Sequence, residues 1–66
     1  MLYRASQPIT VLAFGDNHHA AVTVPPGDLL EVIGPAQDDR FVIVSIKGEQ
    51  LLLLESDLST RGERLA

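Results

Sequence analysis

An antiparallel all-β domain of five or six short strands is the fold class that the sequence predicts. Short runs of β-branched and other apolar residues recur along the 66-residue chain, with glycine, proline or asparagine turns between them. No window of eleven residues shows a clean helical stripe of apolar residues, and no segment resembles the crossover helix that parallel strands need. The pattern therefore indicates one domain, residues 1–66, folded as a small barrel or sandwich.

The first half of the chain contains three predicted strands, residues 9–14, 20–24 and 29–33. Gly15-Asp16-Asn17 is a turn sequence, so the first two strands are expected to form a hairpin. Pro25-Pro26-Gly27-Asp28 ends the second strand, because proline has no N–H to donate to a strand ladder.

The second half contains a hairpin whose two arms, residues 41–46 and 49–54, are apolar on both faces. Lys47 and Gly48 are its expected turn residues. This turn fixes two faces of paired side chains: Val42 and Val44 with Leu53 and Leu51, and Phe41 and Ile43 with Leu54 and Leu52. Alternation normally leaves one face of an antiparallel pair in water, so both faces of this hairpin need a cover.

A chain of this size has one small core, which can cover only one face of the hairpin. We expect the face of Phe41, Ile43, Leu52 and Leu54 to point outward and to form an interface. Ser45 and Gln50 lie on that face, and they tolerate a wetter rim better than Ile46 does. The protein is therefore predicted to be a homodimer or a higher homo-oligomer. The alternative is that Met1-Leu2-Tyr3 folds over the second face as a terminal arm.

The C-terminal part is predicted to contain a single helical turn. Glu55-Ser56-Asp57-Leu58 is expected to form one 3₁₀ turn near Ser56, whose hydroxyl can accept from a backbone N–H. Residues 59–65 are expected to be a short charged tail.

Residues 20–65 resemble the SH3-like barrel in the order of their parts. The match consists of Gly27-Asp28 leading into Leu30 and Val32, the tight turn at Lys47-Gly48, and the helical turn after the last long strand. In peptide-binding members, a tryptophan stands near the position of Phe41 or Arg40, and a proline and a tyrosine stand at those of Glu55 and Leu58. The resemblance therefore implies the fold but not polyproline binding.

Two further resemblances concern the whole chain. Asp57-Leu58-Ser59-Thr60-Arg61-Gly62 is similar to the D-L-x-x-R-G end of small uncharacterised bacterial proteins, which implies the same fold and a cytoplasmic location but no activity. The chain also resembles the plasmid-borne dihydrofolate reductase of the small-barrel type in fold and length. That likeness implies an enzyme with its site at a subunit interface, although Glu49-Gln50-Leu51 is the nearest match to the V-Q-I-Y motif of that family.

Few residues could carry chemistry. His18 and His19 follow Asp16 and Asn17, and imidazoles with a carboxylate can bind zinc, nickel or copper. We expect an exposed turn instead, because neighbouring strand residues point to opposite faces. Asp38-Asp39 is expected to be a solvated turn.

Catalytic residues are not predicted either. Ser56 and Asp57 are adjacent in sequence, which does not give the geometry of a nucleophile, base and orienting acid. No cofactor is predicted.

Charge and composition limit the remaining function classes. Five Lys and Arg against nine Asp and Glu give a net charge of −4, which repels nucleic acid, although a local basic edge at Arg61 and Arg64 remains an alternative. The absence of cysteine, of a leader-like start and of any apolar run beyond Leu51–Leu54 favours a cytoplasmic protein without a membrane span. The sequence thus predicts a non-enzymatic interaction or assembly module.

Overall fold

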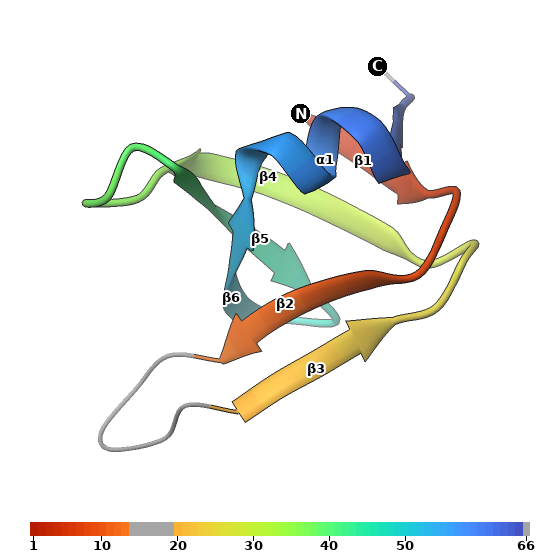
Figure 1. The fold of residues 1–66 in the computed structure, drawn as a ribbon. Coiled ribbons are helices and arrows are strands. Elements are labelled where there is room, and N and C mark those ends of the chain that lie inside the picture. Colours follow the sequence, from red (N-terminus) through yellow and green to blue (C-terminus); the bar gives the residue numbers. More distant parts are fainter. Residues whose placement is uncertain (14–19, 66) are drawn as a thin grey trace.

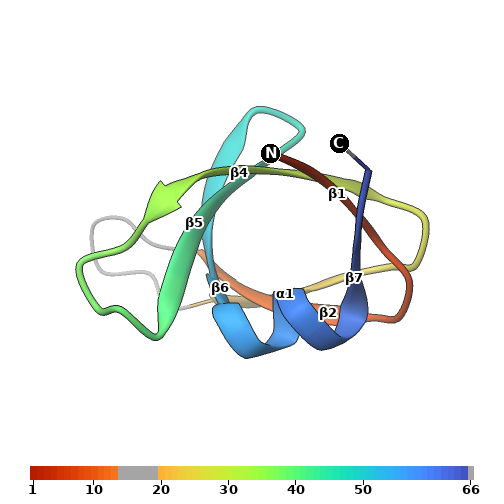
Figure 2. The same cartoon turned by 90° about the horizontal axis from the view of Figure 1, so that it is seen from above.

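The computed structural model describes residues 1–13 and 20–65, which form one antiparallel sheet and one helix (Figure 1). The strands are β1 (Leu2–Ala5), β2 (Ile9–Ala13), β3 (Ala20–Val24), β4 (Leu29–Pro35), β5 (Phe41–Ile46), β6 (Glu49–Leu54) and β7 (Gly62–Arg64), and the helix is α1 (Glu55–Arg61). In the sheet they follow the order β3-β2-β6-β5-β4-β1-β7. The sheet curls around an interior, as the view in Figure 2 shows. The predicted all-β class is confirmed.

The β5–β6 hairpin has the register that its turn residues predict. Lys47 and Gly48 have φ angles of 52° and 84°, and positive φ at both central residues is the conformation of a two-residue hairpin turn. Phe41 lies opposite Leu54 and Ile43 opposite Leu52, as expected. The predicted register of the β5–β6 hairpin is therefore confirmed.

The core lies inside the curled sheet and is entirely apolar. Its buried members in the described residues are Ala5, Ile9, Val11, Val24, Leu30, Val44, Ile46, Leu51, Leu53 and Leu58. None of the charged or polar side chains in residues 1–13 and 20–65 is buried. Burial alternates along the hairpin arms because successive strand residues point to opposite faces, so Val44 and Leu53 are inside while Ile43 and Leu54 are not.

Strand β4 joins the two parts of the sheet. Its first residues, Leu29–Glu31, pair with β1, and residues 31–35 pair with β5. The β4–β5 register shifts between Val32 and Gly34, which is a bulge that leaves Ile33 half exposed. A bulge bends a strand and increases its twist, so this position helps the sheet to curl.

The expected 3₁₀ turn near Ser56 is wrong. Glu55–Arg61 is a seven-residue α-helix, Leu54 is its N-cap, and no side chain caps it, so the Ser56 hydroxyl does not play the expected part. Isolated helices this short are unstable, and tertiary packing decides whether they form. Here the packing is supplied by Leu58, which is 5% exposed against the core.

The count of five or six strands is also too low, because both ends of the described chain add a strand. β1 pairs with β4 on one side and with β7 on the other, and β7 lies within the segment that was expected to be a tail. The alternative in which Met1-Leu2-Tyr3 covers the outer face of the hairpin is wrong as well. β4 lies between β1 and β5, so this segment continues the sheet rather than crossing it.

Candidate interaction surface

The outer face of the β5–β6 hairpin carries the four residues that the sequence places in an interface. Phe41, Ile43 and Leu52 are partly buried by their neighbours, and Leu54 is 39% exposed. All four point away from the core, because their neighbours Val44 and Leu53 fill it. The outward orientation of this face is therefore as predicted, whereas its role as an interface remains a prediction.

A fifth residue, Leu12, enlarges this face. Strand β2 pairs with the far side of β6, which sets Leu12 directly opposite Leu52. Leu12 is 37% exposed, so a row of apolar side chains crosses three strands from Ile43 through Leu52 to Leu12. Sequence reasoning missed Leu12, because nothing local indicates that residues near position 12 pair with residues near position 52. We call Leu12, Phe41, Ile43, Leu52 and Leu54 the outer apolar face.

A hollow of about 420 Å³ lies beside this face. Its apolar lining comes from Phe41, Ile43 and Leu52, and the loop between β4 and β5 supplies the rest of its wall with Ala36, Gln37 and Asp38. The outer apolar face is thus uneven. The hollow has room for an apolar side chain from a partner, while Leu12 and Leu54 are the more exposed side chains nearby.

The loop that bounds the hollow is held by Asp38 and Arg40. The Arg40 guanidinium donates from Nε to Asp38 Oδ1 (3.1 Å) and from Nη2 to Oδ2 (2.7 Å), and the Arg40 backbone N–H also donates to Oδ1 (3.0 Å). The side-chain and backbone hydrogen bonds from Arg40 lower the pKa of Asp38 from 3.8 to about 2, and the pKa of Arg40 is raised by the same contact. These bonds fix the backbone immediately before Phe41.

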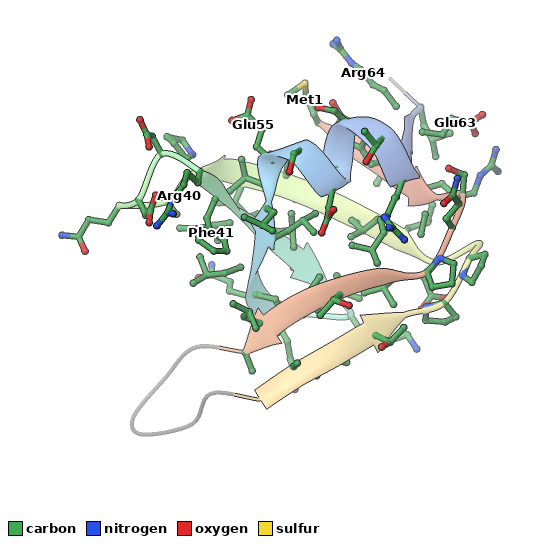
Figure 3. All side chains as sticks on the ribbon, in the orientation of Figure 1. Met1, Arg40, Phe41, Glu55, Glu63 and Arg64 are labelled. Atoms are coloured by element: carbon green, nitrogen blue, oxygen red, sulfur yellow. The ribbon has the colours of Figure 1, made fainter. Side chains whose placement is uncertain are left out.

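Charged groups mark one end of the outer apolar face. Figure 3 shows Arg40 and Phe41 at the start of β5, away from Met1, Glu63 and Arg64. The backbone N–H of Glu55 donates to the carbonyl of Arg40 (2.9 Å), so the start of α1 is tied to the same end of the hairpin. Asp38, which lines the hollow, and its partner Arg40 are therefore the acidic and the basic residue at the rim of the outer apolar face.

The other predicted candidates do not come together as a site in the described residues. His18 and His19, with Asp16 and Asn17, lie outside the described residues. Asp38 and Asp39 are both exposed, and Asp38 is bonded to Arg40 as described above. Within residues 1–13 and 20–65, no group of three or more His, Cys, Asp or Glu could hold a metal ion.

The expected basic edge at Arg61 and Arg64 contains acids as well as arginines. Arg61 Nε lies 3.9 Å from Asp57 Oδ1, and Arg61 Nη1 donates to the Pro8 carbonyl (3.3 Å). Beside Arg64, Glu63 forms an ion pair with Arg4 across the β1–β7 ladder. Such exposed pairs reduce the local positive potential that a nucleic-acid backbone would meet.

No known family model matches the chain, and comparisons with curated proteins and with solved structures gave no significant match. In the part of the chain that the structure describes, no helix has the length and apolar character needed to cross a membrane.

Proposed function

We propose that this protein is a non-enzymatic interaction or assembly module that self-associates through its outer apolar face. The observation that carries this proposal is the row from Ile43 through Leu52 to Leu12, with Phe41 and Leu54 beside it, on the side of the sheet away from the core. Contiguous exposed apolar side chains of a few hundred Å² mark interaction sites on small proteins. The proposal keeps the SH3-like barrel as its fold, supported by the β4-β5-β6 meander, the helix after it and the pairing of β7 with β1.

A symmetric dimer would bury about a fifth of the surface of each copy. The described protein has an accessible surface of 4457 Å², and a stable interface takes about 800 Å² from each partner, or about a fifth of that surface. The outer apolar face would form the dry centre, and the polar residues around it would form the rim. In a two-fold arrangement, the same residues serve as protrusion and as recess, so Leu54 or Leu12 of one copy can enter the hollow of the other.

The test is a leucine-to-glutamate change on the outer apolar face. Wild-type protein at tens of micromolar should sediment at twice the 7.2 kDa monomer mass or more, and Leu52→Glu should give a folded monomer, because an unpaired carboxylate would be buried in the interface. The matched control is Leu29→Glu, the same substitution at a 52% exposed leucine on β4 outside this face, which should remain associated.

Three outcomes would contradict the proposal. The first is a wild type that sediments as a monomer, and the second is dissociation by Leu29→Glu as well as by Leu52→Glu. The third is a complex with DNA or RNA tighter than micromolar at physiological salt, which would favour the nucleic-acid alternative over an acidic module of this kind.

A further inference from the structure

The free edge of β3 is a second surface, distinct from the outer apolar face. β3 is the last strand in the sheet order, and it pairs with β2 from Ala20 to Val24. Its other edge has no neighbouring strand among the described residues. An edge strand presents a row of unpaired N–H and C=O groups, which are a template for another strand.

The two edge strands of this sheet, β7 and β3, differ in how well they discourage pairing with another strand. β7, at the opposite edge, has only three residues, and two of them are the charged and exposed Glu63 and Arg64. Short, charged edge strands are one way in which natural sheets discourage pairing. β3 has five residues, none of them charged, proline or glycine. The sequence therefore protects the β7 edge and leaves the β3 edge open to a partner.

Val22 on β3 is half exposed although it lies on the core face of the sheet. It lies opposite Val11 in the β2–β3 ladder and shares its face, yet Val11 is fully buried and Val22 is 46% exposed. A hollow of about 360 Å³ adjoins it, lined partly by Val24, Ile46 and Leu51. Thr23 of the same strand also lines this hollow, and so do the charged residues Asp28, Lys47 and Glu49.

We propose that the β3 edge pairs, antiparallel, with β3 of a second copy, with Val22 opposite Val22 of the partner. This register sets Ala21 opposite Thr23 and places no charged residue opposite another. The same self-pairing of β7 centred on Glu63 would set two carboxylates against each other, which is unfavourable. In the β3 pair, each Val22 lies beside the other on the inner face and covers it. Because β3 is uncharged and pairs with itself without unfavourable contacts, the partner strand is β3 of a second copy.

The β3 contact goes beyond the proposed function and does not depend on it. It consists of the edge of one five-residue strand, and we expect it to form at about 1 mM and not at tens of micromolar. If both contacts form, alternation of the two two-fold interfaces produces an open linear chain, in which Leu12 of the outer apolar face lies next to Ala21 of the paired strand.

The experiment uses Leu52→Glu as the parent, so that the outer apolar face does not contribute. Translational diffusion measured by NMR between about 20 µM and 1 mM should show the parent approaching twice its monomer mass. Val22→Lys and Val22→Glu in this parent should each remain monomeric, because each puts like charges opposite each other. An equimolar mixture of the two should associate again. A control, Gln7→Lys, adds the same charge at an exposed position away from β3 and should behave as the parent does.

Rescue by mixing separates pairing from a folding defect, because a damaged monomer would not be repaired by a second damaged monomer. A parent that stays monomeric at 1 mM would overturn the proposal, and so would a mixture that does not associate. If acetyl-Thr-Val-Thr-Val-Thr-amide shifts the β3 resonances of a parent that stays monomeric, the occupant is a strand of another protein and self-pairing is wrong. Failure of the outer apolar face as an interface would leave all of these outcomes unchanged.

Discussion

Four consecutive leucines, Leu51 to Leu54, provide an internal test of which face of β6 is inside. Leu53 is fully buried and Leu51 is 6% exposed, whereas Leu54 is 39% exposed. Replacing a buried leucine with alanine loses transfer free energy and leaves a cavity, so Leu51→Ala and Leu53→Ala should each destabilise the protein by about 2–5 kcal/mol. At Leu52 and Leu54, solvent can occupy the vacated space, and we expect about 1 kcal/mol or less.

These differences are large compared with the total stability. At about 0.05–0.15 kcal/mol per residue, a chain of 66 residues has about 3–10 kcal/mol in all. Leu53→Ala can therefore leave a measurable fraction unfolded without denaturant. A parallel Leu→Val series, with smaller losses at the same four positions, keeps the comparison measurable in that case.

The assay is urea unfolding followed by circular dichroism at low micromolar concentration, where self-association adds least to the apparent stability. All four variants replace a leucine with alanine, so they differ only in the position of the substitution. Equal losses at all four positions, or larger losses at Leu52 and Leu54, would refute the alternation of burial on which both the core and the outer apolar face depend.

Three further predictions concern other features. Gly48→Ala should destabilise the protein by about 1–2 kcal/mol in thermal unfolding, because Gly48 has φ of 84°, which is unfavourable for alanine. An added Cβ would have no atom within 4 Å, so only backbone strain changes. An unchanged stability would contradict the assigned turn. NMR titration should find the pKa of Asp38 near 2, and Arg40→Ala should return this pKa toward 3.8. Because the pKa is lower in the folded state, the pair stabilises the protein above pH 3.8, and this stabilisation is lost as the pH falls through about 2. Chelators should leave the melting temperature unchanged, and a fall that disappears on replacing His18 or His19 with alanine would reveal a metal site.

The hairpin that carries the outer apolar face could be predicted because its determinants are local. Lys47-Gly48 fixes the turn, the turn fixes the register, and the register assigns every side chain of both arms to a face. Ser45 and Gln50 then indicate the outer face. Four of the five residues of the outer apolar face follow from this short segment alone.

The parts that could not be predicted depend on distant partners. Leu12 joins the outer apolar face only because β2 pairs with β6, about forty residues later in the chain. β7, Gly62-Glu63-Arg64, has no apolar pattern and forms because β1 supplies its backbone partners. Glu55–Arg61 contains Ser59 and Thr60, which are poor helix formers, and becomes helical because Leu58 enters the core. Local propensity is too weak to indicate any of these pairings.

The position of β1 between β4 and β7 has a consequence for the order in which the protein folds. Arg4 and Glu63, which pair across this junction, are 59 residues apart in the sequence, so their contact carries the closure entropy of almost the whole chain. Contacts of such long sequence separation slow folding into the millisecond-to-second range, whereas a hairpin such as β5–β6 forms in about 1–10 µs. We therefore expect the β5–β6 hairpin, and with it most of the outer apolar face, to form before β1 and β7 pair, so the rate of that pairing sets how long this face is present on an open sheet.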